Sequence, residues 1–381
     1  PDLNWEYEPL RREIYEMLHW WIDLGVDGFR LDVISFISKT DGLPDGNDTI
    51  GAMMGVKGVE HYFYGPRLHK YLHEMAENTF NKYDAFTVGE CQGTGIEMSK
   101  LMTGDYRKEL SVVFSFDHVE NPGKKRFSEY RYDLRPMAKE LVKWQLDYGN
   151  HCWPTVFFEN HDTTRMPSKV CPEGFYRSEL SKLLAVMQLT MKGCPFIYQG
   201  QEIGMCNGDF KDMSELRDVE SINYYNELIE KGESHEKVFE VVSVGSRDNG
   251  RTPVCWTKGE NAGFTTGTPW ISLHSDYQRL NLATDMEKEK SVWRFYKRLL
   301  HLRSSHPVLT QGIFIPVSPE NADHCAYERT LDGEKVLVVC NFEKQQHIPC
   351  ARSGKLLLSN YGLAEKNDTL YRPYEVAVFT L

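Results

Sequence analysis

Two residues of opposite charge, Arg30 and Asp32, lie within the otherwise apolar stretch 28–33. Apolar residues alternate with them, which predicts a short, wholly buried β-strand that carries both charges on one face. A buried carboxylate stays ionised only if a cation and hydrogen bonds compensate for the lost water, and the Arg30 guanidinium can do this. A charged carboxylate that is shielded from water is suited to attack an electrophilic carbon. The alternative is an ion pair that only stabilises the sheet.

Two further acids, Glu90 and Asp162, also follow apolar stretches, and Asp162 stands next to His161. A charged carboxylate as nucleophile and a protonated carboxylic acid as proton donor are sufficient to cleave a glycosidic bond with retention of configuration. We expect Glu90 to have a raised pKa, because nearby carboxylates disfavour its charged form. Asp162 and His161 would then bind sugar hydroxyls and stabilise positive charge at the anomeric carbon. The alternatives are a helix cap for Asp162 and a buried core position for His161.

Apolar strands and amphipathic helices alternate along the chain up to about residue 303, after an opening helix over 10–21. This alternation predicts a parallel sheet, and almost every strand ends in polar residues, as the strands of a (β/α)8 TIM barrel do. The predicted strands are 28–33, 85–88, 112–116, 156–158 and 195–198, with a long excursion at about 200–290 before the last helix.

A closed barrel of this kind needs eight strands, whereas the five predicted strands correspond only to about strands 4–8. We therefore expect the missing elements to precede Pro1 and the chain to be the C-terminal part of a longer protein. The long loop at 41–58 shows no regular period, and we expect it to form a wall of the site.

The pattern changes to short alternating runs after residue 303, separated by turn signals such as Asp332-Gly333. We therefore expect two domains. The first, 1–303, would be the C-terminal portion of a catalytic α/β barrel, and the second, 304–381, would be an antiparallel, β-sandwich-like domain.

Charge and cysteine content restrict the partners. The net charge is −11 and no long basic run is present, so we expect no nucleic-acid partner. No apolar run approaches the length of a membrane span, so we expect no membrane partner. The nine cysteines are scattered without paired or metal-type spacing, which favours reduced thiols and a cytoplasmic location.

Several motifs resemble those of the α-amylase superfamily, glycoside hydrolase family 13. The stretch 28–33, the stretch 88–90 and Asn160-His161-Asp162 are similar to the signatures around its fourth, fifth and seventh strands. Further segments resemble the oligo-1,6-glucosidase and α-glucosidase subgroup, namely 1–6, 36–39 with 41–44, 198–205, 246–249, 251–253 and 262–267.

The resemblance implies a retaining, exo-acting α-glucosidase that hydrolyses short oligosaccharides. Asp32 would be the nucleophile, Glu90 the general acid/base and Asp162 the transition-state stabiliser. The substrate-binding residues implied are Arg30, His161, Asn160 and Arg247, of which Arg247 would contact the non-reducing end of the sugar; alternatively, Arg247 only pairs with Asp248 or another nearby acid.

Two residues bear on the linkage. Val33, directly after the expected nucleophile, is the subgroup's mark of α-1,6 preference, because an apolar side chain there removes a hydroxyl that could orient the second sugar. Packing of a buried strand would also select valine. Gln92 stands where relatives commonly have an aromatic or small residue near the second sugar.

Glu159 is a further departure from the family pattern, because it replaces an asparagine that is often found before Asn-His-Asp.

We expect no cofactor and no metal ligand within this chain, although calcium occurs in the family on a loop that would lie before Pro1. Lys124-Lys125-Arg126 could bind a sugar phosphate, or it is a solvated basic run.

Alternatives on the same scaffold are an α-1,4-glucosidase, a trehalose-6-phosphate hydrolase and a sucrose isomerase or transglucosidase. From another class, non-catalytic relatives serve as subunits of amino-acid transporters, although these usually lose the catalytic acids. We also expect the isolated chain to have little activity, because a half barrel leaves sheet edges open and the pocket incomplete.

Overall fold

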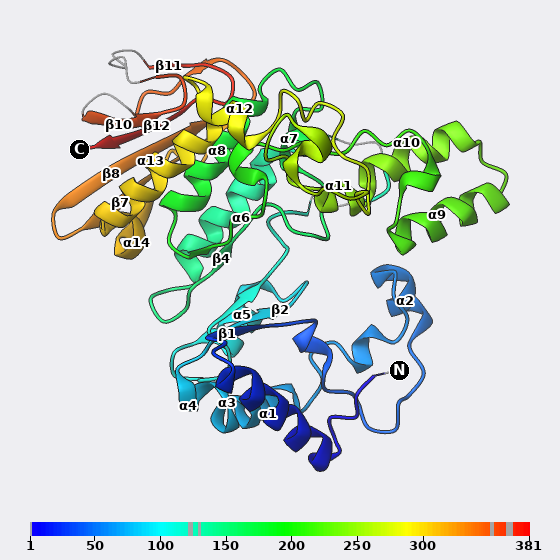
Figure 1. Ribbon diagram of the computed structural model, residues 1–381. Helices are drawn as coiled ribbons and strands as arrows, with labels where there is room; N and C mark the ends of the chain where they lie inside the picture. Colours follow the sequence, from blue (N-terminus) through cyan, green and yellow to red (C-terminus); the bar gives the residue numbers. More distant parts are fainter. Residues whose placement is uncertain (1, 121–124, 129–130, 351–353, 363–368) are drawn as a thin grey trace. The chain divides into compact units, whose positions relative to one another are not determined.

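The computed structural model describes residues 2–120, 125–128, 131–350, 354–362 and 369–381 (Figure 1). The chain forms two compact units. The first unit comprises Pro1–His118 and Lys143–Thr155, and the second comprises Val119–Val142 and Val156–Leu381.

The first unit is built on a three-stranded parallel sheet in the order β1-β2-β3. The strands are β1 (Gly28–Leu31), β2 (Phe86–Glu90) and β3 (Val112–Phe114). The connections between them contain helices, as a parallel arrangement requires. The alternation of strands and helices predicted from the sequence is confirmed here.

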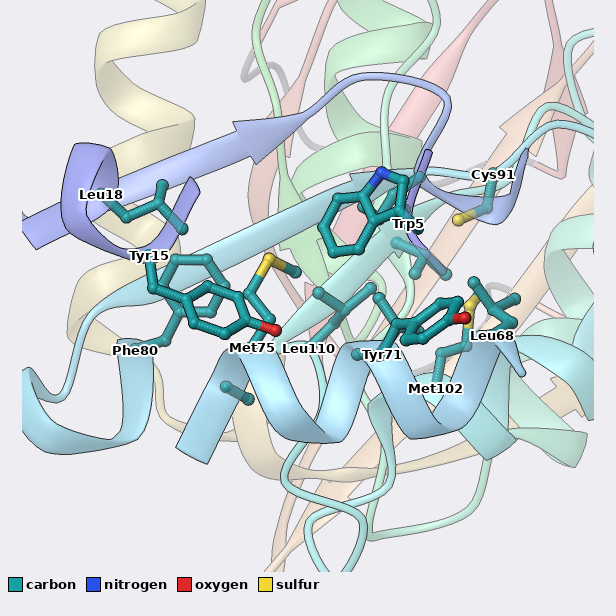
Figure 2. Close-up of a cluster of buried hydrophobic side chains, with 14 residues drawn as sticks. Trp5, Tyr15, Leu18, Leu68, Tyr71, Met75, Phe80, Cys91, Met102 and Leu110 are labelled. Atoms are coloured by element: carbon teal, nitrogen blue, oxygen red, sulfur yellow. The ribbon is translucent and has the colours of Figure 1, made fainter. Parts of the chain in front are cut away.

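The core of this unit joins α1 (Glu8–Asp23) and α3 (Leu68–Asn78) to the sheet. Figure 2 shows Tyr15 of α1 beside Met75 of α3, and Leu18 of α1 belongs to the same cluster. The α3 residues recur three and four positions apart, which places them on one face of the helix. The buried members of that face are Leu68, Tyr71, Leu72, Met75 and Ala76.

The prediction of a wholly buried strand at 28–33 is wrong. The strand ends at Leu31, its apolar residues Phe29 and Leu31 are only half-buried, and Arg30 is exposed. The Asp32 side chain is 72% exposed, and Val33 is exposed as well. β1 is the edge strand of the sheet formed by the described residues. A mostly apolar hollow of about 670 Å³ adjoins it, so this end of the strand is not enclosed.

The loop predicted at 41–58 contains a short helix, α2 (Asp48–Met54). Asn47 caps it, because its Oδ1 accepts hydrogen bonds from the backbone N–H groups of Thr49 and Ile50. Asparagine and glycine also favour turns, which is why the sequence pattern indicated a loop.

Two short strands, β4 (Thr155–Val156) and β5 (Cys194–Pro195), continue the series and pair with each other. Both were predicted, but as longer strands. In the second unit, α8 (Arg177–Thr190) and α13 (Val292–Ser305) pack together, and α8 is buried from Leu180 to its end. A helix buried on all sides must contact neighbours on more than one face.

The last part of the second unit is a five-stranded antiparallel sheet in the order β10-β12-β8-β7-β6. This confirms the predicted change to an antiparallel β arrangement. Asp332 and Gly333, both at positive φ, form the turn between β7 and β8, as an Asp-Gly hairpin signal requires. Strands here are β6 (Ile313–Val317), β7 (His324–Leu331), β8 (Glu334–Asn341), β10 (Lys355–Ser359) and β12 (Val376–Thr380), and β9 (Gln346–His347) pairs with β11 (Leu370–Tyr371).

The remaining helices include those of the excursion after β5. The division into domains at 303 and 304 stays a prediction. No helix of the described residues is long and apolar enough to cross a membrane. The other helices are α4 (Phe80–Tyr83), α5 (Gly95–Thr103), α6 (Leu134–Asp147), α7 (Met166–Val170), α9 (Val219–Glu230), α10 (His235–Gly245), α11 (Asp248–Arg251), α12 (Leu282–Glu287) and α14 (Val308–Gln311), with 3-10 turns at Ile34–Phe36, Val59–His61, Gln201–Ile203, Met213–Glu215 and Glu260–Gly263.

Candidate active site

The ends of β1 and β2 bring two carboxylates to one guanidinium. Arg30 Nη1 donates a hydrogen bond to Asp32 Oδ1, and Arg30 Nη2 lies 2.7 Å from Glu90 Oε2. The ion pair expected between Arg30 and Asp32 is therefore present, and Glu90 shares the same cation. β1 and β2 are adjacent and parallel, with Arg30 opposite Val88 in the register, so their carboxyl ends meet at one edge.

The two carboxylates differ in environment. The side chain of Glu90 is 14% exposed, against 72% for Asp32. Burial raises the pKa of Glu90, and the neighbouring Asp32 raises it further, although Arg30 and the Val33 N–H act in the opposite direction. The predicted direction of the Glu90 pKa is confirmed, but burial rather than a like charge is its largest cause.

Val33 has a left-handed backbone conformation, with φ 38° and ψ 40°. This conformation is costly for a β-branched residue, by about 1–3 kcal/mol. It directs the Val33 backbone N–H to Glu90 Oε2, at 3.2 Å. Gln92 is exposed in the turn that follows β2. Strain at this point therefore coincides with a hydrogen bond to the more buried carboxylate.

A second group of predicted residues follows β4 in the second unit. The Asn160 side chain accepts a hydrogen bond from the backbone N–H of Asp162 at 2.8 Å, which fixes a tight turn. The Asn160 N–H in turn donates to Thr163 Oγ1 at 3.1 Å. His161, between them, is exposed rather than buried in the core.

Two arginines and a histidine surround the Asp162 carboxylate. Arg251 Nη2 lies 2.9 Å from Oδ1, Arg247 Nη1 lies 3.3 Å from the same oxygen, and His161 Nε2 lies 3.1 Å from Oδ2. Arg251 also donates to the backbone oxygen of His161 at 2.8 Å. Asp162 is thus held as an ion-paired group rather than as a helix cap.

The sequence analysis did not select Arg251 as a site residue. The sequence spacing could have indicated Arg251, because it stands four residues after Arg247, and both arginines reach the same carboxylate. Arg247 also pairs with Asp218 and Glu220. It therefore connects the Asp162 turn to the start of α9, and it does more than pair with one nearby acid.

Lys125 and Arg126 are the described residues of the basic run that could have bound a phosphate, and Lys125 is exposed. Arg126 Nη2 lies 2.8 Å from Asp218, its Nη1 lies 2.5 Å from Glu220, and its Nε donates to the Gly245 oxygen. Two carboxylates therefore already balance its charge. Lys124 lies outside the described residues.

Within the described residues, no group of three or more histidine, cysteine, aspartate or glutamate side chains could hold a metal ion. The expectation that this chain needs no cofactor stays a prediction.

The site residues thus form two groups, Arg30, Asp32, Val33 and Glu90 in the first unit and Asn160, His161, Asp162 and Arg247 in the second. That the three acids converge on one sugar ring stays a prediction. Residues 1–312 match the family model of the alpha-amylase catalytic domain. The chain belongs to the alpha-amylase family.

Relatives extend this assignment over the whole chain. It is 39% identical over 396 residues to an oligo-1,6-glucosidase of Bacillus cereus, with 100% of this chain and 70% of the relative covered. It is 38% identical over 395 residues to a trehalose-6-phosphate hydrolase of Bacillus subtilis (strain 168), with 100% and 69% covered.

Solved structures agree with these relatives. A trehalose-6-phosphate hydrolase of Bacillus licheniformis matches with a TM-score of 0.91 at 36% identity, covering 100% of this chain and 69% of that one. A trehalulose synthase matches with a TM-score of 0.92 at 35% identity, covering 100% and 70%. The alpha-amylase family member described here is therefore a glycoside hydrolase with the TIM-barrel fold and a C-terminal antiparallel β domain, as the sequence predicted.

Proposed function

We propose that the protein is a retaining, exo-acting α-glucosidase that hydrolyses α-1,6 bonds of short oligosaccharides. The observation that carries the proposal is the Arg30 bridge between an exposed carboxylate, Asp32, and a half-buried one, Glu90, with a raised pKa. Two carboxylates whose environments separate their protonation are what a retaining glycosidase requires. The oligo-1,6-glucosidases among the relatives support this substrate class.

In the first proposed step, Asp32 attacks the anomeric carbon of the terminal glucose. Glu90 donates its proton to the oxygen of the leaving sugar, and the glycosidic bond breaks. This step leaves a glucosyl ester on Asp32 and an ionised Glu90.

In the second step, Glu90 accepts a proton from water, and the water oxygen attacks the anomeric carbon. The ester bond to Asp32 breaks, glucose leaves with retained configuration, and Glu90 is protonated again. Arg30 would hold both carboxylates in position throughout. Asp162 would stabilise the positive charge that develops on the sugar, with Asn160, His161 and Arg247 orienting the ring.

Linkage preference is assigned to Val33 and Gln92. The exposed Val33 side chain directly follows the proposed nucleophile, at a position suited to contact the leaving sugar. An apolar side chain there offers no hydroxyl to orient an α-1,4-linked sugar.

We test this with the full-length protein and isomaltose, maltose, sucrose and trehalose 6-phosphate in parallel, measuring glucose release. We expect isomaltose to be hydrolysed with by far the highest kcat/KM. Equal rates on isomaltose and maltose would remove the assignment of Val33. Preferential hydrolysis of trehalose 6-phosphate would favour the activity named for two of the relatives. No turnover of any of these substrates would favour a non-catalytic role.

We also propose a cytoplasmic location and a small oligosaccharide, rather than nucleic acid or a membrane, as the partner. All nine cysteines are free thiols, which is compatible with a reducing compartment.

A further inference from the structure

A buried ion pair lies directly beneath the turn that carries Asp162. Arg165 Nη1 is 3.0 Å from Glu159 Oε2, and their side chains are 0% and 2% exposed. Among the described residues no other ion pair has both side chains so fully buried. Removing two charges from water costs several kcal/mol per ion unless geometry and hydrogen bonds compensate, so such a pair contributes little net stability. Its contacts instead indicate a positioning role.

Glu159 and Arg165 bracket the turn on both sides. Glu159 Oε1 accepts a hydrogen bond from the Met166 backbone N–H at 2.9 Å, while Oε2 binds Arg165. The backbone N–H of Arg165 donates to Asn207 Oδ1 at 2.8 Å. The segment between the two charged residues, which contains Asn160, His161 and Asp162, is therefore closed at its base.

The guanidinium of Arg165 reaches two further segments. Nη1 donates to the Gln199 backbone oxygen at 2.8 Å, just after β5, and Nη2 donates to the Gly250 backbone oxygen at 3.4 Å, in α11. It also lies 4.9 Å from the centre of the Tyr198 ring, and the Tyr198 hydroxyl donates to the same Gly250 oxygen at 2.8 Å. One buried cation thus joins the β4 turn, the β5 end and α11.

Gly250 makes the connection to α11 tight. A Cβ atom at this position would lie 2.6 Å from the Thr163 backbone oxygen and 2.8 Å from the Asn160 backbone oxygen, which no real Cβ tolerates. The next residue, Arg251, binds both the Asp162 carboxylate and the His161 backbone oxygen. The position of Arg251 relative to Asp162 therefore depends on how α11 is held against the turn.

We infer that the buried Glu159–Arg165 pair positions Asp162 and Arg251 for the transition state, without touching the sugar itself. Glu159 stands where the family pattern often has asparagine, and a neutral amide would leave the buried Arg165 charge without its counterion. The inference rests on the proposed glucosidase function, and both residues act only through Asp162 and its arginines.

The test is a double-mutant cycle in the full-length protein with p-nitrophenyl α-glucoside and isomaltose as substrates. We expect Glu159→Gln to lower kcat by roughly 10- to 100-fold with KM changed less than about threefold, the range that an ångström-scale displacement of a positioned group produces. In an Asp162→Asn background, the same substitution should lower kcat by less than about threefold, because the carboxylate that it positions is already absent. If Glu159→Gln lowers kcat by the same factor in the wild type and in Asp162→Asn, the losses are additive and the inference is overturned.

The matched control is Arg329→Lys. Arg329 is also 0% exposed and binds three backbone oxygens, of Thr190, Leu309 and Gly312, in the β7 part of the second unit. Arg329→Lys should lower the melting temperature and leave kcat unchanged. A lower melting temperature with unchanged kcat in Glu159→Gln would mean a purely structural pair and refute the positioning role. If Glu159→Gln does not fold, Glu159→Asn takes its place in the same cycle.

The two failures are distinguishable. A wild-type protein that hydrolyses no α-glucoside contradicts the proposed function and the inference together. A wild-type protein that hydrolyses isomaltose, combined with additive losses in the cycle, contradicts only the inference.

Discussion

Single residues at the ends of β1 and β2 illustrate how one cation can bind two carboxylates in different environments. Arg30 binds Asp32 and Glu90, whose side chains are 72% and 14% exposed. Burial is the largest influence on the pKa of Glu90 and raises it. The roles that we propose, Asp32 as nucleophile and Glu90 as proton donor, are therefore separated by depth in the fold, because both residues are carboxylic acids.

The first prediction is that Asp32→Asn lowers the pKa of Glu90. The Asp32 carboxylate raises that pKa, second to burial among the raising influences, so its removal leaves burial opposed by Arg30 and the Val33 N–H. Titration of the Glu90 carboxyl carbon by NMR measures the change. Asp27→Asn, an equal charge change at the opposite end of β1, is the control and should leave the Glu90 pKa where it was. An unchanged or higher Glu90 pKa in Asp32→Asn would show that the two carboxylates are not coupled.

Within the elements, the turn after β1 stores strain at Val33. We predict that Val33→Asn raises the free energy of unfolding by about 1 kcal/mol, because asparagine tolerates the left-handed region and the half-exposed valine side chain loses little burial. Urea denaturation at neutral pH measures it. Destabilisation by this substitution would mean that the valine side chain contributes more through packing than its backbone conformation costs.

Another element-level prediction concerns Lys182, which is buried where α8 meets α13. Its Nζ donates to the Lys290 backbone oxygen at 2.6 Å and lies 5.9 Å from the Phe295 ring. Burial lowers the pKa of Lys182 to about 8. The unfolded chain has the ordinary lysine pKa of about 10.4, so between these values it holds a proton that the folded protein has released. The free energy of unfolding therefore rises with pH across this window, and below about pH 8 the full penalty is present.

Lys182→Met removes this penalty. We expect the variant to be at least as stable as the wild type at pH 7. Between pH 8 and pH 10, the free energy of unfolding of the wild type should rise by about 1–3 kcal/mol more than that of the variant. Urea denaturation curves at several pH values give the comparison, and the control is Lys297→Met, an exposed lysine of the adjacent helix α13 near the Trp293 ring. Parallel pH dependences in Lys182→Met and the wild type would contradict the assignment.

For the molecule as a whole, periodicity predicted the order and type of most elements. The α3 face and the Asp332-Gly333 hairpin depend only on local spacing and turn chemistry, so they could be predicted from neighbouring residues. The exposure of Asp32 could not, because it depends on what adjoins the edge of β1 in space. The same limit applies to Arg251 and to the Glu159–Arg165 pair, whose partners are fixed by how turns fold back on one another.

Arg329 of β7 joins the antiparallel sheet of the second unit to its helices. The guanidinium donates to the backbone oxygens of Thr190, at the end of α8, and of Leu309 and Gly312, and the Tyr327 hydroxyl lies 2.6 Å from Thr190 Oγ1. We predict that Arg329→Met lowers the free energy of unfolding by about 3 kcal/mol, because it removes a charged donor from each of three buried carbonyl groups. Helices and sheet should still unfold in one transition, since α8 and β7 share a buried boundary.

Differential scanning calorimetry and circular dichroism together measure the loss of stability and the number of unfolding transitions. A single transition at a lower temperature, with kcat per folded molecule unchanged, is the expected result. Two separate transitions in Arg329→Met would mean that the sheet is an independent folding unit and that the arginine alone couples it to α8. That outcome would favour the predicted domain boundary near residue 303, whereas a single transition means that the C-terminal strands and the preceding helices stabilise one another.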